Sequence, residues 1–272
     1  CEKYRRPSLP AAADTVAYYL ADRSQDLKTS TLKRRLATIS GAHRAAGVKS
    51  PTKYAQVKYV WAGIRREKGV AQSHMKPTLT KHIRAMVEHL PDSLLGVRDR
   101  ALILLGYAGA MRRSELVGLD VTDLATSDEG LVVLIPKSKT DQMGAGRKIG
   151  IPFGEHPETC PVKAVQAWID AAYIDAGPLF RSVNKHGHVS DSRLSDQVVA
   201  DVVKRSLLAA GKSARKYAAH SLRAGLITQA AMAGVSERAI QDQSGHKSLS
   251  VMRRYIRDGS LFRENAAAKV GL

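Results

Sequence analysis

Residues 233–257 read AGVSERAIQDQSGHKSLSVMRRYIR, and this stretch carries the most specific pattern in the chain. Gly245 and His246 lie between two short helical patterns, and Tyr255 follows His246 by nine residues. Taken by itself, Tyr255 is typical of an aromatic side chain that packs on a core and keeps its hydroxyl in water. Its spacing from His246 becomes informative only together with two motifs further upstream.

These upstream motifs place titratable and charged side chains at helical spacing. Residues 220–223 read HSLR, so that His220 and Arg223 share one helix face one turn apart. Residues 109–116 read GAMRRSEL, which ends an apolar helix and begins another one. Each motif also has a plain structural explanation. HxxR can arise at any helix start, and Arg112 with Glu115 is typical of a surface ion pair.

The composition is that of a folded, strongly basic, soluble protein. The 272 residues include 43 Lys and Arg against 25 Asp and Glu, a formal charge of +18, and 44% are hydrophobic, which excludes a disordered polybasic tail. The longest nearly apolar run, residues 101–111, is shorter than the roughly 20 residues that span a bilayer, and no secretion signal opens the chain. Two cysteines, Cys1 and Cys160, cannot form a disulfide framework, which favours a reducing compartment. A first residue other than Met predicts a truncated or processed product.

The positive charge is concentrated at the start of the chain. Residues 1–76 hold sixteen Lys and Arg and five acidic residues, so that +11 of the +18 lies there. A polyanion is the natural partner of such a segment, because each neutralised phosphate releases condensed counterions. The alternative is a ribosome-like or merely solubilising basic surface.

The periodicity predicts a mainly α fold in two domains. Apolar residues recur at helical spacing over 15–21, 32–43 and 54–64, with Pro51 in the first turn of the third helix. The stretch 71–78 breaks this pattern before Pro77, so the boundary is placed between a small helical domain, 1–76, and a larger domain, 77–272. The larger domain is expected to contain a buried helix over 99–108, helices around 162–169 and 198–207, and a small antiparallel sheet pairing 131–135 with 149–152.

The order and spacing of the motifs resemble the tyrosine recombinase (phage integrase) family, and the stretch 233–257 is most similar to its Cre-like members. The resemblance covers nearly the whole chain: a helical core-binding domain, a linker, GAMRRSEL, a lysine in a β-hairpin, HSLR, and GH with a tyrosine nine residues beyond. It implies that the larger domain is catalytic. Arg113 and Ser244 depart from the family pattern, which usually has an apolar residue and Leu at these places.

The resemblance also implies a role for each motif residue. Arg112 is the first catalytic arginine, Glu115 its acidic support, His220 and Arg223 the HxxR pair, His246 the second histidine, and Tyr255 the nucleophile. Lys139 corresponds to the hairpin lysine, with Lys137 and Lys148 as alternatives, because the register of the loop from 136 to 148 is not fixed by the sequence.

These residue types suit the breaking of DNA without a metal or any other cofactor. A tyrosine that attacks phosphorus creates a transition state with negative charge on the non-bridging oxygens, and two guanidinium groups can stabilise that charge. His220 can help to deprotonate the phenol, whose ordinary pKa is about 10. The family assigns the protonation of the leaving 5′ oxygen to the lysine. The phosphotyrosyl bond stores the energy of the broken bond, so rejoining needs no ATP.

Double-stranded DNA is therefore the expected partner, with a homotetramer on two duplexes joined by a C-terminal docking helix over 260–270, and the expected location is the cytoplasm. Phosphate contacts are expected from basic residues of the first domain: Lys33, Arg34, Arg35, Lys53, Lys58, Arg65 and Arg66. Two alternatives remain at this point. One is a type IB topoisomerase that relaxes DNA as a monomer, and the other is a DNA-binding architectural protein that does no cleavage.

Overall fold

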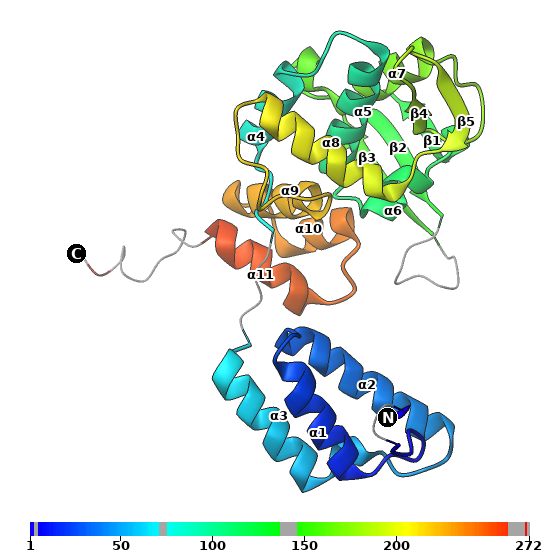
Figure 1. Ribbon diagram of the computed structural model, residues 1–272. Coiled ribbons are helices and arrows are strands. Elements are labelled where there is room, and N and C mark those ends of the chain that lie inside the picture. Colours follow the sequence, from blue (N-terminus) through cyan, green and yellow to red (C-terminus); the bar gives the residue numbers. More distant parts are fainter. Residues whose placement is uncertain (3–4, 71–74, 137–145, 261–269, 271–272) are drawn as a thin grey trace. The chain divides into compact units, whose positions relative to one another are not determined.

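The computed structural model describes residues 1–2, 5–70, 75–136, 146–260 and 270, with no side-chain description for 258–260 (Figure 1). The chain divides into two compact units, Cys1–His74 and Met75–Leu272, called here the N-terminal unit and the C-terminal unit. Both are mainly helical, and strands occur only in the second among the described residues, which confirms the predicted fold class.

The N-terminal unit consists of α1 (Ala13–Ser24), α2 (Thr29–Ala45) and α3 (Ala55–Lys68), preceded by a short 3-10 turn, η2 (Pro51–Lys53). Its core is small, with five buried hydrophobic side chains: Val16, Leu20, Leu32, Val57 and Ile64. The three helices match the predicted ones. Pro51 does not begin α3, as the sequence predicted, but the separate 3-10 turn, because Tyr54 has an extended backbone that interrupts the helix.

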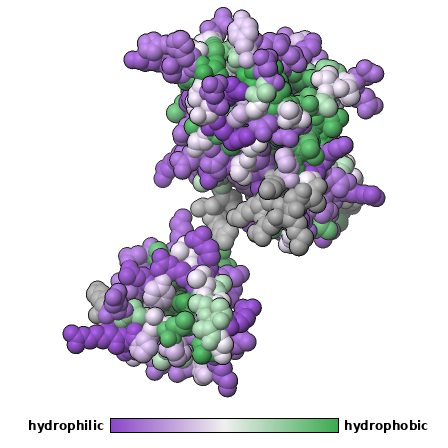
Figure 2. Space-filling view, turned by 90° about the vertical axis from the view of Figure 1, so that its right-hand side faces the viewer, coloured by the Kyte–Doolittle hydropathy of each residue, from purple (hydrophilic) through white to green (hydrophobic). Residues whose placement is uncertain are grey.

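The seven basic residues predicted to contact phosphates all lie on the surface of the N-terminal unit: Lys33, Arg34, Arg35, Lys53, Lys58, Arg65 and Arg66 are exposed. In Figure 2, hydrophilic residues lie around the edge of this unit, and hydrophobic residues gather in the middle of the face in view. Arg35 donates a hydrogen bond to the hydroxyl of Tyr19. The charge of this unit is thus carried by long side chains in water around a minimal core.

The C-terminal unit is a larger helical body with two small sheets. The helices are α4 (Thr80–Glu88), α5 (Leu94–Ala108), α6 (Arg113–Gly118), α7 (Pro161–Ala171), α8 (Asp196–Ala209), α9 (His220–Met232), α10 (Glu237–Ser244) and α11 (Leu249–Ser260), with 3-10 turns η3 (Val121–Asp123) and η4 (Pro157–Thr159). The strands are β1 (Leu124–Ser127), β2 (Gly130–Ile135), β3 (Arg147–Pro152), β4 (Arg181–Val183) and β5 (Val189–Arg193).

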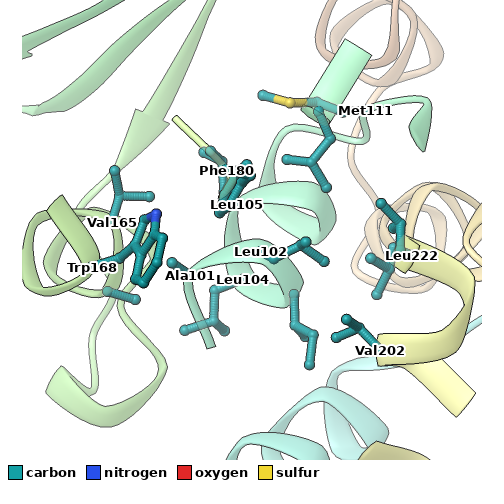
Figure 3. Packing of buried hydrophobic residues seen from close by; sticks show 14 of the residues in the cluster. Ala101, Leu102, Leu104, Leu105, Met111, Val165, Trp168, Phe180, Val202 and Leu222 are labelled. Carbon is teal, nitrogen blue, oxygen red and sulfur yellow. The ribbon is translucent and has the colours of Figure 1, made fainter. Parts of the chain in front are cut away.

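Helix α5 forms the centre of this unit, because its apolar residues are buried on every side. Val165 and Trp168 of α7 pack on one side of it, and Val202 of α8 and Leu222 of α9 lie on the other (Figure 3). The indole N–H of Trp168 donates to the Leu179 carbonyl at 2.7 Å, so the largest core side chain has its polar atom satisfied. The first turn of α9 is therefore packed against the central helix α5 through Leu222.

The predicted hairpin is present, with Leu131 opposite Ile151 and Val133 opposite Ile149. Strand β1 adds an antiparallel partner on the other edge of β2, and β4 pairs with β5 in a second sheet that the sequence did not predict. Lys137 and Lys139, between β2 and β3, lie outside the described residues. Nearly all of the predicted docking helix at the C-terminal end also lies outside them.

The segment before α4 crosses α9 at close range. The Thr78 N–H donates to the Ser221 carbonyl at 2.9 Å, and a Cβ at Gly225 would lie only 2.1 Å from the Thr78 carbonyl oxygen. Glycine at 225 is required for this approach. Within the described ranges, no helix is long and apolar enough to cross a membrane.

Candidate active site

The HSLR motif forms the first turn of α9 and separates its two polar side chains by burial. His220 is exposed, whereas Arg223 is almost fully buried at 1% exposure. The Ser221 hydroxyl accepts the Ala218 N–H at 3.0 Å, which satisfies a free donor at the helix start. The helix therefore presents a histidine to solvent and a guanidinium to the interior one turn apart.

Arg223 is held by two partners from distant parts of the chain. Its Nη1 donates to the Ala110 carbonyl at 2.6 Å, and its Nη2 lies 3.0 Å and 3.2 Å from the two ring nitrogens of His246. Burial and, to a smaller extent, the neighbouring Arg112 and Arg147 guanidinium groups together lower the pKa of Arg223 to about 10, and Glu115 opposes part of this shift. The guanidinium remains charged at neutral pH in a desolvated setting.

Glu115 accepts two hydrogen bonds from Arg112 at the start of α6. The Glu115 carboxylate accepts the Arg112 backbone N–H at 3.0 Å, and its other oxygen accepts a hydrogen bond from Arg112 Nη1. The Glu115 side chain is only 1% exposed and that of Arg112 is 22% exposed. The pair is thus buried on its acidic side, unlike the surface ion pair that the motif alone suggests.

His246 follows a left-handed turn at the end of α10. Gly245 has φ +63°, a conformation that favours glycine, and it reverses the chain so that the imidazole faces Arg223. Burial and the nearby Arg223, Arg112, His220 and Arg147 lower the pKa of His246 to about 3. At neutral pH the imidazole is therefore uncharged, with one nitrogen as donor and the other as acceptor.

Ser244 approaches the same imidazole. It is completely buried, and its Oγ lies 2.8 Å from His246 Nδ1. When Ser244 and Arg223 both donate to Nδ1, the ring proton resides on Nε2 and is available to a ligand oxygen. The residue that departs from the family pattern thus contributes a polar contact that Leu cannot make.

Tyr255 lies on α11, which packs along α9. Its side chain contacts a small hydrophobic cluster made of Ile227, Ala231, Ile240 and Met252. Its hydroxyl lies 2.9 Å from His220 Nε2, and the two rings are 5.9 Å apart and tilted by 58°. The packing of α11 on α9 therefore brings together a phenol and an imidazole that are 35 residues apart in the sequence.

Arg147 is a site residue that the sequence analysis missed. It begins β3, where Ile149 and Ile151 are buried, and the period-two alternation places Arg147 on the same inward face. Its Nη2 lies 3.6 Å from a Glu115 oxygen, and its Nη1 donates to the Gln243 carbonyl at 3.0 Å. The inward register of an arginine among alternating isoleucines was the signal that could have found it.

The structure thus brings Arg112, Glu115, His220, Arg223, His246 and Tyr255 into one site of the C-terminal unit. Lys139 lies outside the described residues, and Lys148 is exposed on β3 opposite Leu134. The predicted phosphate-binding residues of the N-terminal unit belong to the other compact body.

A model of the phage integrase family matches residues 76–260, which is more than half of the chain and includes all of these site residues. The chain belongs to the phage integrase family. It is accordingly a tyrosine recombinase, an enzyme that breaks and rejoins DNA strands.

Two similar proteins match nearly the full length of this chain. An integrase/recombinase xerD homolog of Selenomonas ruminantium is 38% identical over 270 residues, which cover 98% of this chain and 79% of the relative. The recombinase Cre of Escherichia phage P1 is 26% identical over 279 residues, with 95% of this chain and 79% of the relative covered.

Two solved structures share the fold. The XerH site-specific recombinase bound to a palindromic difH substrate has a TM-score of 0.57 at 19% identity, covering 90% of this chain and 72% of its own. The Tn1549 transposon integrase in complex with transposon right end DNA has a TM-score of 0.63 at 17% identity, covering 92% of this chain and 82% of its own.

Proposed function

We propose that this recombinase cleaves each strand of a specific duplex site by attack of the Tyr255 hydroxyl on the scissile phosphorus. The bond from phosphorus to the 5′ oxygen breaks as the phosphotyrosyl bond forms, so that the enzyme becomes linked to the 3′ side of the nick. The observation that carries this proposal is the 2.9 Å contact between the Tyr255 hydroxyl and His220 Nε2, beside two arginines and a neutral histidine.

His220 takes the role of the base in this step. The unperturbed phenol, with a pKa of about 10, is a weak nucleophile at neutral pH, and an imidazole nitrogen at hydrogen-bond distance can accept its proton as the bond to phosphorus forms. His220 is exposed, so the imidazolium that results remains hydrated. The leaving 5′ oxygen takes a proton from the hairpin lysine, which we assign to Lys139 on the resemblance to the family.

Arg112 and Arg223 stabilise the charge that develops on the non-bridging oxygens. Guanidinium groups donate two parallel hydrogen bonds to phosphate and stay charged throughout the reaction. Both are oriented by protein contacts, Arg112 by Glu115 and Arg223 by the Ala110 carbonyl, so little reorganisation accompanies the reaction. Neutral His246 adds a hydrogen bond from Nε2–H.

Rejoining is the same step in reverse, with a 5′ hydroxyl of the partner strand as the nucleophile and Tyr255 as the leaving group. Because the phosphotyrosyl bond keeps the energy of the phosphodiester, the proposal requires neither ATP nor a metal ion. Cleavage is therefore expected to persist in excess EDTA. Loss of activity in chelator and its return with Mg²⁺ would contradict the proposed chemistry.

Strand exchange is proposed to take place in the cytoplasm, in a homotetramer on two duplexes. The resemblance to the family is the ground for proposing this assembly, in which the residues after α11 dock on a neighbouring subunit. The exposed lysines and arginines of the N-terminal unit are proposed to bind DNA phosphates as the core-binding domain of residues 1–76, linked to the catalytic domain of residues 77–272.

The nucleophile is tested with Tyr255→Phe, which removes one oxygen. On a substrate whose cleaved strand diffuses away, the wild-type enzyme should accumulate a covalent protein–DNA adduct, and the variant should form none while binding the same DNA. His220→Gln serves as the matched variant, which should slow adduct formation without abolishing it. A normal adduct with Tyr255→Phe would assign the nucleophile to another residue.

A further inference from the structure

We propose that Arg147 is a positioning residue that holds the two halves of the phosphate-binding site at a fixed separation. One half is the Arg112 and Glu115 pair at the start of α6, and the other is the turn from α10 to His246. Arg147 contacts both halves through the two ends of a single guanidinium. This inference rests on the proposed function, because it concerns the same phosphate.

The first contact completes the surroundings of Glu115. One carboxylate oxygen accepts from Arg112 Nη1, and the second accepts the Arg112 backbone N–H at 3.0 Å and lies 3.6 Å from Arg147 Nη2. A carboxylate at 1% exposure between two guanidinium groups has little freedom to rotate. Arg147 therefore restrains Arg112 through the acid that both of them contact.

The second contact anchors the turn before His246. Arg147 Nη1 donates to the Gln243 carbonyl at 3.0 Å, one of the last carbonyls of α10, which lacks a partner within the helix. The Gln243 side chain in turn donates to the Ala108 carbonyl at 2.9 Å and to the Gly150 carbonyl at 3.2 Å. The end of α10 is thus attached to β3 and to the end of α5.

Gly245 provides the space for this arrangement. A Cβ at this position would lie 2.7 Å from Arg147 Nε and 2.9 Å from its Cζ, closer than side chains pack. The glycine of the GH motif therefore has two requirements: a left-handed turn and room for the Arg147 guanidinium. The second requirement links the GH motif directly to β3.

An arginine fits this position and a lysine does not. The guanidinium is a planar fork whose two terminal nitrogens face different partners, whereas a lysine has a single ammonium group that reaches one of them. Arg147 Nε and Nη2 have no hydrogen-bond partner among the described residues, and burial lowers the pKa of the group, partly offset by Glu115. Burying a guanidinium with two unpaired nitrogens costs stability. We therefore attribute the arginine at position 147 to the geometry of its contacts.

The test compares Arg147→Lys and Arg147→Gln with the wild-type enzyme in single-turnover cleavage of a site-containing duplex. Both variants should slow adduct formation by roughly 10–100-fold, the loss typical when an orienting partner of an active-site group is removed. DNA affinity and the unfolding temperature, measured on the same samples, should change little for Arg147→Lys. Arg113→Gln is the matched control, since Arg113 is a half-exposed neighbour of the site that pairs with Asp196 at 2.9 Å.

A double-mutant cycle shows whether Arg147 acts through Glu115. Adding Arg147→Lys to Glu115→Gln should slow cleavage much less than it slows the wild type, because the carboxylate that Arg147 restrains is already lost. Full activity of Arg147→Lys would overturn the proposal, since charge alone would then suffice. Independent effects that multiply in the double variant would overturn it as well.

The same assay separates failure of this inference from failure of the proposed function. A wild-type enzyme that forms no adduct through Tyr255 would disprove the proposed function. If the wild type forms the adduct through Tyr255 and both Arg147 variants form it at the same rate as the wild type, only the role of Arg147 is disproved.

Discussion

The two units carry positive charge in opposite ways. The seven basic side chains singled out in the N-terminal unit stand in water around a core of five buried hydrophobic residues. In the C-terminal unit, Arg223 is buried and Arg112 and Arg147 are mostly buried, each with named partners. Exposed cations are screened by salt, so each attracts an anion weakly and their contributions add up. Buried cations attract an anion strongly and at a fixed position.

This difference predicts two kinds of mutational effect. Neutralising a buried arginine of the C-terminal unit should reduce the rate of cleavage and leave its salt dependence nearly unchanged. Neutralising exposed residues of the N-terminal unit should reduce affinity, change its salt dependence and leave the rate on bound DNA intact. Each of the following experiments can break this division.

The largest effect is expected for Arg223→Ala. The variant loses a charged donor that is fixed by the Ala110 carbonyl, so single-turnover cleavage should fall by at least roughly 10²–10³-fold, the loss found for one preorganised electrostatic donor. Arg112→Ala should behave alike, and Arg113→Gln is the exposed control. A loss that disappears on saturation with DNA would show that Arg223 acts in binding, contrary to the division between the units.

Removal of residues 261–272 should have the next largest effect, on strand exchange. If these residues dock on a neighbouring subunit, the truncated enzyme should still bind a single site and cleave it, while cooperative assembly and recombination between two sites fall. Native gels and a two-site recombination assay measure both quantities. Unchanged recombination would show that these residues are not needed for assembly, and efficient relaxation of supercoiled DNA by a strict monomer would contradict the proposed tetramer.

A pH experiment examines the neutral state of His246. Its pKa is lowered to about 3 in the folded protein, below the unperturbed value of 6.5, so between these values the unfolded chain binds a proton that the folded site does not. Stability from this residue is therefore fully present above pH 6.5 and falls with decreasing pH, by up to about 1.4 kcal/mol per pH unit. The free energy of unfolding of His246→Gln should fall less steeply from pH 6.5 to 4. Parallel curves would show that His246 is protonated in the folded protein.

The smallest effect per residue is expected in the N-terminal unit. Replacing Lys33, Arg34 and Arg35 by Gln should weaken specific and nonspecific DNA binding alike and reduce the slope of log K against log salt concentration by roughly 2–3 units. Cleavage at saturating DNA should not change. A matched triple replacement of the exposed Lys81, Arg84 and Lys163 on the C-terminal unit tests whether any exposed charge has this effect. An unchanged slope and affinity for the first triple variant would make its charge a solubility feature.

The sequence predicted the three helices of the N-terminal unit, most helices of the C-terminal unit, the central hairpin and the motif residues because their signals are local, but it did not predict the helix at Thr80–Glu88. Spacing alone places His220 and Arg223 on one turn, and a short β-rich apolar run identifies β2, with β3 as its hairpin partner. The missed contacts depend on a turn of the backbone or on residues far apart in the chain. Ser244 lies against His246 only because Gly245 turns back, and Arg147 meets Gln243 from 96 positions away. The polar strands β4 and β5 lack the apolar alternation on which strand prediction relies.

The positive charge in the described part of the site makes the free energy of unfolding depend on whether DNA is bound. Three guanidinium groups surround one carboxylate and a neutral imidazole, and burial lowers the pKa of Arg223 and of Arg147. The free energy spent in holding these cations out of water is recovered when a phosphate arrives, because a ligand that binds only the folded state stabilises that state. We therefore expect the recombinase released from its site to be the less stable form, and DNA to protect it from unfolding and proteolysis.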